Sequence, residues 1–342
     1  EGEAIENELI YGSVSGRKSN EDGEDLGGAL IGIFKTGTTE YTKENAIATA
    51  TSEDDGSFSF EKVPYGTWVI REIESPKGYV LSEEEISVTI SEVDEVVEIE
   101  LVNYFITGNI ALTKVDKDYP DNKLSGAVFE VYSDTNENGK LDKKDELLGE
   151  MGEVEKGIYQ MDDLRYGKYL VREKTAPTGF VLDENVYPVS IEENGKTYNV
   201  ENEAGKGFVN EAQKGSLKIV KTSSDGKVEG FSFRVIGKDY DQTFTTDKNG
   251  EIEIDGLRIG EYTVSEVSDK ASSGYILPAD QKVTIKTDET ATVTMHNELR
   301  DTPKTGDDFS LGLWVSLAAA FTLGAGIFGF AGYKCGRKKK ED

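Results

Sequence analysis

A stretch of twelve residues, YLVREKTAPTGF, recurs in related form at three places along the chain. Each copy has an aromatic residue, an aliphatic residue and a glutamate at alternate positions, and a glycine, an aromatic residue and a leucine follow. Alternate side chains of a β-strand lie on one face, so the glutamate shares the apolar face of its strand. A buried carboxylate is costly unless it is paired or neutralised, so each copy requires a partner on a neighbouring strand. The three glutamates are Glu72, Glu173 and Glu266.

Each repeat also carries a lysine and an asparagine on the apolar face of a predicted strand. A strand upstream of the glutamate alternates apolar residues and ends in lysine, as in Leu112 and Lys114 or Ile219 and Lys221. The strand that closes each repeat ends in asparagine on the same parity as its aliphatic residues. Every repeat therefore supplies one of each residue type to one interior: Lys18, Glu72 and Asn103; Lys114, Glu173 and Asn210; Lys221, Glu266 and Asn297.

This constellation resembles the Cna B-type or SpaA-type (prealbumin-like) domains of Gram-positive surface proteins and pilins. In that family a lysine and an asparagine condense into an intramolecular isopeptide bond. The resemblance implies an all-β fold of tandem Ig-like β-sandwiches, here followed by one C-terminal transmembrane helix. It also implies that each glutamate is protonated and polarises the asparagine amide, while burial keeps the lysine neutral and nucleophilic. Ammonia would then leave without a separate enzyme or a required cofactor.

The first and third repeats depart from the family pattern. Gly16 stands where the other repeats have an aliphatic residue two positions before the lysine. The third copy lacks the proline found at Pro76 and Pro177, and its segment is one residue longer. The alternative to a covalent bond is a plain buried Lys–Glu ion pair with the asparagine hydrogen-bonded to it.

The second repeat offers two asparagines as the crosslink acceptor, Asn202 and Asn210. From Asn103 to Lys114 there are eleven residues, and the same interval separates Asn210 from Lys221. The equal spacing favours Asn210.

The repeats divide the chain into five segments. Residues 8–105, 106–212 and 213–300 are three SpaA or Cna B-type sandwiches, and residues 301–342 form the C-terminal tail. The acid-rich stretch 83–100 has alternating aliphatic residues, which predicts a pair of strands with one solvated face. Asn7 lies eleven residues before Lys18. We therefore expect residues 1–7 to be the remnant of a preceding repeat.

The second repeat contains an insertion, DTNENGKLDKKD, from Asp134 to Asp145. Its oxygen-bearing side chains and its glycine have the spacing of an EF-hand or dockerin-like calcium loop, with Asp instead of Glu at the twelfth position. A polar hairpin tip rich in turn formers is the alternative interpretation. The candidate Ca²⁺ ligands are Asp134, Asn136, Asn138, the carbonyl of Lys140, Asp142 and Asp145.

Composition limits the function classes. The chain of 342 residues has a net charge of −28, so nucleic acid is an improbable partner. The single cysteine, Cys335, lies beyond the apolar C-terminal segment, so disulfides do not stabilise the repeats. One histidine, His296, lies on the solvent-facing parity of its strand, and without a usable His or Cys a hydrolytic triad lacks its base. We therefore expect no enzymatic activity apart from autocatalytic isopeptide formation.

The tail combines three signals. The motif Thr302, Pro303, Lys304, Thr305, Gly306 precedes an apolar segment from about Leu311 to Tyr333, which is long enough to span a bilayer, and a basic cluster follows. This combination resembles a sortase cell-wall sorting signal of the LPxTG kind, with Thr302 in place of leucine. The resemblance implies that sortase cleaves after Thr305 and joins it to peptidoglycan, with the membrane contacted only through the span before sorting.

These features predict a secreted protein anchored in the cell wall of a Gram-positive bacterium. The repeats would form a membrane-proximal stalk that presents an adhesive or other N-terminal region to a host or other surface ligand, whose identity the sequence does not give. One alternative is a pilus subunit, although the nearest pilin-like stretch, YPDN at Tyr119 to Asn122, lacks the lysine. The other is the stalk of a secreted, wall-anchored hydrolase.

Overall fold

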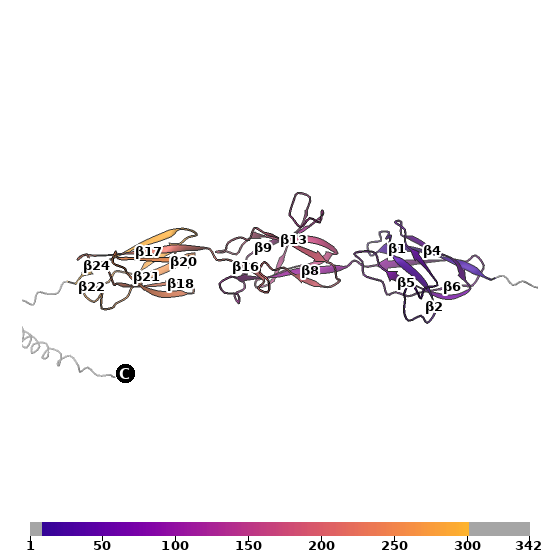
Figure 1. Ribbon diagram of the computed structural model, residues 1–342, viewed down its shortest axis with the longest axis horizontal. Coiled ribbons are helices and arrows are strands. Elements are labelled where there is room, and N and C mark those ends of the chain that lie inside the picture. The colour runs from indigo at the N-terminus through magenta and orange to yellow at the C-terminus, as the bar shows by residue number, and fades with distance from the viewer. Residues whose placement is uncertain (1–8, 301–342) are drawn as a thin grey trace, which may run out of the picture.

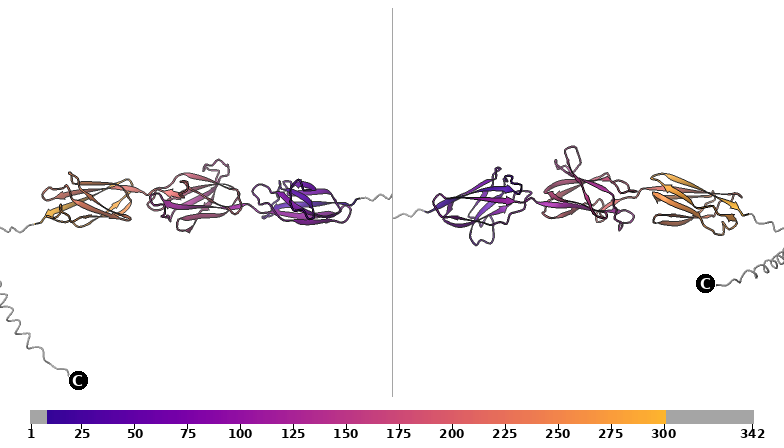
Figure 2. Two further views of the ribbon diagram at one scale, coloured as in Figure 1. Left: turned by 60° about the horizontal axis from the view of Figure 1, so that its bottom comes forward. Right: turned by 180° about the vertical axis from the view of Figure 1, so that it is seen from behind.

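The computed structural model describes residues 9–300, and all 24 secondary-structure elements in this range are strands. The strands form three sandwiches that lie end to end in chain order (Figures 1 and 2). This confirms the all-β fold of tandem sandwiches. The expected repeat remnant at 1–7, the sorting motif and the C-terminal helix lie outside the described residues. Within residues 9–300, no helix is long and apolar enough to cross a membrane.

The first sandwich consists of β1 (Tyr11–Asn20), β2 (Leu30–Lys35), β3 (Ala48–Thr51), β4 (Ser57–Pro64), β5 (Gly66–Glu74), β6 (Ile86–Ile90) and β7 (Val96–Asn103). Its two sheets have the orders β4-β1-β7 and β3-β2-β5-β6. Both strands expected in the acid-rich stretch exist, but their pairing differs from the prediction. β6 pairs with β5 and β7 pairs with β1, so the two strands bury their apolar faces from opposite sheets.

The second sandwich consists of β8 (Thr107–Asp116), β9 (Val128–Ser133), β10 (Glu146–Glu150), β11 (Gly152–Glu155), β12 (Ile158–Arg165), β13 (Gly167–Thr175), β14 (Val186–Ile191), β15 (Thr197–Asn199) and β16 (Phe208–Asn210). One sheet has the order β10-β9-β13-β14. The other has the order β11-β12-β8-β15, and β16 also pairs with β8. The predicted calcium loop connects β9 to β10.

The third sandwich consists of β17 (Lys214–Ser223), β18 (Ser232–Gly237), β19 (Tyr240–Thr245), β20 (Glu251–Arg258), β21 (Gly260–Glu266), β22 (Tyr275–Ile276), β23 (Gln281–Ile285) and β24 (Thr290–Leu299). Its sheets have the orders β20-β17-β24-β22 and β19-β18-β21-β23. Each sandwich encloses its own apolar core.

The first and last strands of every sandwich are parallel neighbours. β1 pairs with β7, β8 pairs with β15 and β16, and β17 pairs with β24. Because parallel strands run in the same direction, the chain enters a sandwich at one end and leaves it at the other. This topology accounts for the end-to-end row in Figure 1.

The structure explains why the first repeat has a glycine two positions before its lysine. Gly16 pairs with Phe58 of β4, and a Cβ added at Gly16 would lie only 2.0 Å from Phe58 Cζ. The Phe58 ring, which is 5 % exposed, therefore fills the volume that an aliphatic side chain occupies in the other repeats. Gly16 and Phe58 thus fill the same space that an aliphatic residue fills in the other repeats, and Lys18 still lies on the core face.

Both junctions between sandwiches use the same backbone hydrogen bonds. At the first junction, the Ile106 N–H donates to the Gly78 carbonyl (2.9 Å), and the Ile106 carbonyl accepts from the Tyr166 N–H (2.8 Å). Gly78 has a φ of 91°, which glycine adopts without strain. The bonds of the second junction measure 2.8 and 3.1 Å and join the equivalent residues Gly179, Gln213 and Ile259.

An arginine from the following sandwich spans each junction. Arg258 donates to both carboxylate oxygens of Asp116 (2.6 and 2.8 Å) and to Asp118 (3.0 Å). The Asp116 side chain is fully buried, and although burial acts to raise its pKa, the bonds from Arg258 hold that pKa below its ordinary value. At the first junction, Arg165 donates to Asp22 (2.9 Å), but their side chains are 57 % and 50 % exposed. The second junction is therefore the more tightly fixed.

We expect Arg258→Ala to lower the free energy of unfolding of the second sandwich by about 3 kcal/mol, because it leaves Asp116 buried without a counter-charge. Arg165→Ala, at the equivalent position, should cost less than about 1 kcal/mol because its ion pair is exposed. Denaturant unfolding of the two variants compares them directly. Equal losses would show that burial of the pair does not determine the strength of the junction.

Candidate functional site

Each sandwich buries one lysine, one glutamate and one asparagine between its two sheets. The lysine lies near the C-terminal end of the first strand, the asparagine lies on the last strand, and the glutamate lies on the facing sheet, on β5, β13 or β21. The asparagine is two residues beyond the partner of the lysine in the parallel register, so the two side chains share one face. None of the nine is more than 9 % exposed.

In the second sandwich all three side chains meet. Lys114 Nζ donates a short hydrogen bond to Asn210 Oδ1 and lies 3.5 Å from Glu173 Oε1. Asn210 Nδ2 donates to both oxygens of Glu173, at 2.9 Å each. The amine thus lies beside the amide carbon, and the carboxyl group lies beside both the amine and the amide nitrogen. The structure places Asn210, and not Asn202, against the lysine.

In the first and third sandwiches the glutamate and asparagine meet in the same way. Asn103 Nδ2 donates to Glu72 (2.8 Å), and Asn297 Nδ2 donates to Glu266 (2.6 Å). The lysines donate to backbone carbonyl groups close by. Lys18 Nζ bonds to Leu101 and Ser19, at 3.2 and 3.4 Å, and Lys221 Nζ bonds to Thr222.

Burial shifts the titration of these groups in the direction that amide chemistry requires. Desolvation lowers the pKa of Lys18 and of Lys114 to about 8, and it also lowers the pKa of Lys221. Desolvation raises the pKa of Glu72 and of Glu266 above the ordinary value. In the first and third sandwiches, burial therefore favours a neutral amine beside a neutral carboxylic acid.

Unpaired oxygen atoms in two of the sites also point to a protonated glutamate. Glu72 Oε1 and Asn103 Oδ1 are buried without a hydrogen-bond partner, and so are Glu266 Oε2 and Asn297 Oδ1. All four atoms lack a donor. A proton on the carboxyl group supplies one donor to each site, whereas an ionised carboxylate supplies none.

The backbone orients the glutamates in a way that side-chain patterns do not reveal. The Ser82 N–H donates to Glu72 Oε2 (2.8 Å), and the Asp183 N–H donates to Glu173 Oε2 (2.9 Å). Both donors lie in the loop that follows the glycine and aromatic residue of the repeat. In the third repeat, where this segment is longer, the loop is held by Ser272, which donates to the Val267 carbonyl (3.0 Å).

This arrangement contains the parts needed for an amide transfer. The lysine amine can attack the asparagine Cγ, forming an N–C bond as the bond to Nδ2 breaks. The glutamate carboxyl lies where it can take a proton from the attacking amine and give one to the departing Nδ2, so that ammonia leaves. Lysine loses one hydrogen and the leaving group gains one, so the reaction needs no oxidant or cofactor.

The predicted calcium ligands lie in the loop between β9 and β10, and several of their side chains are joined by hydrogen bonds. Asp134 accepts from the backbone N–H groups of Asn138 (3.1 Å) and Gly139 (2.8 Å), and Gly139 has the positive φ expected at the sixth position. Asn136 and Asn138 both donate their amide groups to Asp142 Oδ2 (2.9 and 3.1 Å).

A cation in this loop would require both amides to turn so that Oδ1 faces inward. Asp145 accepts from the Asp142 N–H (2.7 Å), and its Oδ1 is buried without a partner. Across residues 9–300, no cluster of three or more His, Cys, Asp or Glu side chains is arranged to hold a metal.

The fold and its buried residue set define a prealbumin-like β-sandwich. The family model described as SpaA, prealbumin-like fold domain, matches residues 12–104, 108–206 and 215–299. These matches include most of the chain, which therefore belongs to this family.

The comparison with solved structures finds a protein of similar fold. The chain is similar to the Bacillus anthracis TIE protein, with 24 % identity, a TM-score of 0.67, and coverage of 85 % of this chain and 51 % of that one, about half its length. Weaker likenesses include BcpA, the major pilin subunit of Bacillus cereus (15 % identity, TM-score 0.41, covering 84 % and 99 %). Another is the major pilin SpaD from Corynebacterium diphtheriae (15 % identity, TM-score 0.26, covering 85 % and 98 %). A comparison with curated proteins gives no match.

If the second site reacts, the fragment spanning the second sandwich should be lighter by one ammonia. Glu173→Ala removes the proton carrier and should restore the full mass by reducing the crosslinked fraction to near zero. Intact mass and peptide mapping across Lys114 and Asn210 measure this, and Glu184→Ala on the neighbouring exposed loop is the control. A full mass in the unaltered protein would mean that the three residues form an ion-pair network only.

Proposed function

We propose that the chain is the membrane-proximal stalk of a cell-wall-anchored surface protein, with sandwiches crosslinked by Lys–Asn isopeptide bonds. The observation that carries this proposal is the position of the lysine and asparagine near the C-terminal ends of two parallel neighbours, the first and last strands. Tension enters along the first strand and leaves along the last. A bond from Lys18 to Asn103 would transmit it from one strand to the other, and residues 19–102 would bear none of it.

The crosslink would also stabilise the sandwiches without disulfides. Closing a loop of the length between Lys114 and Asn210 stabilises by about 4 to 5 kcal/mol on the chain-entropy model. Without the bond, tension would shear the hydrogen bonds between the parallel strands. A stalk that holds a distal region away from the wall gains from both effects.

The pilin alternative requires a lysine that sortase can join to the next subunit. The YPDN stretch that would correspond to a pilin motif lies at the second junction, where the Tyr119 ring packs 4.7 Å from the Arg258 guanidinium. Its residues have a role between sandwiches and offer no lysine. A ladder of covalent multimers in wall extracts would favour the pilin, and a catalytic domain upstream would favour the hydrolase stalk.

The anchor is tested at Thr305, the proposed junction with peptidoglycan. Because sortase would form its bond through the Thr305 carbonyl and recognise the side chain, Thr305→Ala should reduce attachment to purified peptidoglycan at least tenfold. The protein would then remain in the membrane fraction or appear in the medium. Lys304→Ala, at the variable position of the motif, is the matched control. Unchanged wall attachment of Thr305→Ala would exclude sortase anchoring through this motif.

We also propose that the loop from Asp134 to Asp145 binds one Ca²⁺. Titration calorimetry should show one site, and calcium should raise the melting temperature of the second sandwich. Asp134→Ala should abolish both effects because it removes the most buried carboxylate of the loop. Asp162→Ala, in the same sandwich but outside the loop, should change neither. If calcium produces no heat and no thermal shift, the loop is a hairpin tip held by its own hydrogen bonds.

A further inference from the structure

The last strand of the second sandwich is broken, unlike the last strands of the other two. β15 pairs Thr197 with Asn109, and β16 pairs Phe208 with Lys114. Thr197 and Phe208 are eleven positions apart, whereas their partners Asn109 and Lys114 are five apart. The last strand therefore has six extra residues at the break. In the first and third sandwiches, eight consecutive pairs in the parallel ladder hold the strand up to Asn103 and Asn297. Asn210 has only the three pairs of β16.

One side chain at the break binds the backbone of β16. Asn202 Oδ1 accepts from the Val209 N–H (2.6 Å), and Asn202 Nδ2 donates to the Val209 carbonyl (2.8 Å). A side-chain amide that bonds both backbone groups of one residue reproduces the contacts of an adjacent strand. Val209 is the residue immediately before Asn210, so this contact fixes the backbone that carries the crosslink acceptor.

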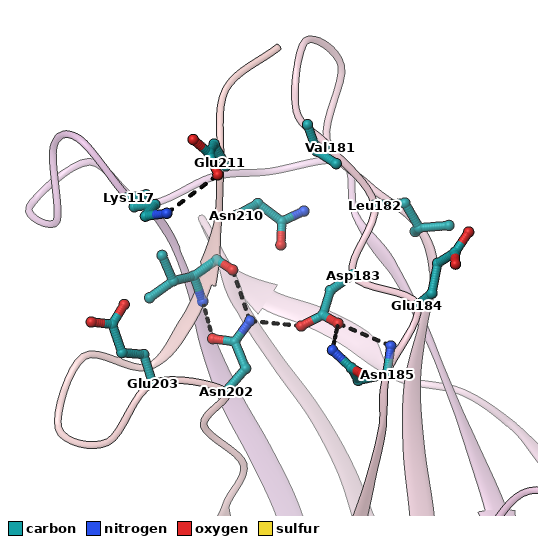
Figure 3. A pocket seen from close by; sticks show the side chains of 11 residues that line it. Lys117, Val181, Leu182, Asp183, Glu184, Asn185, Asn202, Glu203, Asn210 and Glu211 are labelled. Atoms are coloured by element: carbon teal, nitrogen blue, oxygen red, sulfur yellow. Dashed lines mark hydrogen bonds and ion pairs between the residues drawn. The ribbon is translucent and has the colours of Figure 1, made fainter.

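The same amide reaches the loop that orients the glutamate. Asn202 Nδ2 also donates to Asp183 Oδ2 (2.8 Å), and the Tyr187 hydroxyl donates to the same oxygen (2.6 Å). Figure 3 shows Asn202 beside Asp183, with a dashed line between the two side chains. The Asp183 N–H in turn bonds Glu173 (2.9 Å). Through its hydrogen bonds to Val209 and Asp183, Asn202 is therefore connected both to Asn210, the next residue after Val209, and to Glu173.

The surroundings of this connection are open on one side. An open pocket of about 810 Å³ lies over the site, and Asp183, Asn202 and Asn210 are among the residues that line it. Backbone hydrogen bonds such as Val181 N–H to the Glu211 carbonyl (2.8 Å) join the loop to the strand beyond Asn210, but the pocket leaves the space beside Asn202 open. Ser82 and Pro278 occupy the positions equivalent to Asp183 in the first and third repeats, where the last strand is continuous. The Asp183–Asn202 pair occurs where the ladder is interrupted.

We propose that Asn202 is a positioning residue for isopeptide formation between Lys114 and Asn210. It holds Asn210 through Val209 and holds Glu173 through Asp183. The inference rests on the proposed crosslink and adds to it the residue that compensates for the broken strand. Asn202 itself forms no bond to lysine.

The test is the rate at which the second sandwich loses ammonia in the full chain. Cell-free synthesis followed by intact mass and peptide mapping at timed intervals gives this rate. Asn202→Ala should slow formation of the Lys114–Asn210 bond at least tenfold. Bonds in the first and third sandwiches, measured in the same samples, should form at the unaltered rate. Asn199→Ala, an exposed asparagine on β15, is the matched control.

A conservative exchange separates positioning from a general loss of structure. In the double variant Asn202→Asp and Asp183→Asn, the amide at residue 183 can donate to the carboxylate at residue 202, which still accepts from the Val209 N–H. Only the bond to the Val209 carbonyl is lost, whereas Asn202→Ala loses all three. The double variant should react faster than Asn202→Ala, while protease resistance of the second sandwich confirms that both variants fold.

Failure of the proposed crosslink and failure of the proposed role of Asn202 give different results. An unaltered protein without the Lys114–Asn210 bond would overturn the crosslink and, with it, the role of Asn202. A crosslinked protein in which Asn202→Ala reacts at the normal rate would overturn the inference alone. So would a peptide that joins Lys114 to Asn202, or a double variant no faster than Asn202→Ala.

Discussion

The parallel pairing of the first and last strands is the constraint on which the rest of the structure depends. It places the entry and exit of each sandwich at opposite ends, and this in turn lets three sandwiches follow one another in a row. It also brings a lysine and an asparagine from distant parts of the sequence onto adjacent strands. In the first sandwich the ladder extends from Ser13 and Val96 to Asn20 and Asn103. The same hydrogen-bonded ladder thus determines both the end-to-end arrangement of the sandwiches and the proximity of the lysine to the asparagine.

Burial gives these groups their chemical character. A lysine and a glutamate on the surface would be charged and inert toward an amide. Between two sheets, desolvation lowers the amine pKa and raises the pKa of Glu72 and Glu266. The same burial would burden an uncrosslinked sandwich with polar atoms that lack partners. Converting the amine and the amide into one neutral linkage would remove part of that cost, so stability and the proposed reactivity would have a common origin.

Strand periodicity was enough to predict the buried lysine, glutamate and asparagine, because an alternating pattern states which face a residue occupies. The equal spacing of Asn103 and Asn210 from the following lysines favoured Asn210 over Asn202, and Asn210 is the asparagine that contacts Lys114. Sheet membership was harder to predict: β6 and β7 were expected as a pair but belong to different sheets, since alternation does not identify the neighbour of a strand. Contacts made through backbone atoms, such as the Asp183 N–H to Glu173, leave no mark in the sequence. The role of Phe58 beside Gly16 depends on a register between distant strands.

The two junctions share a backbone geometry but differ in the solvent exposure of their ion pairs. Arg258 and Asp116 are largely shielded, whereas Arg165 and Asp22 are half exposed. Thermal bending should therefore concentrate at the first junction, where dissolved ions screen the attraction. The second and third sandwiches would then move together as one rigid unit. The first sandwich would change its direction relative to them by bending at the first junction. In the wall-anchored stalk proposed above, a stiff base would then carry a compliant outer joint, which would widen the volume that the distal end can search.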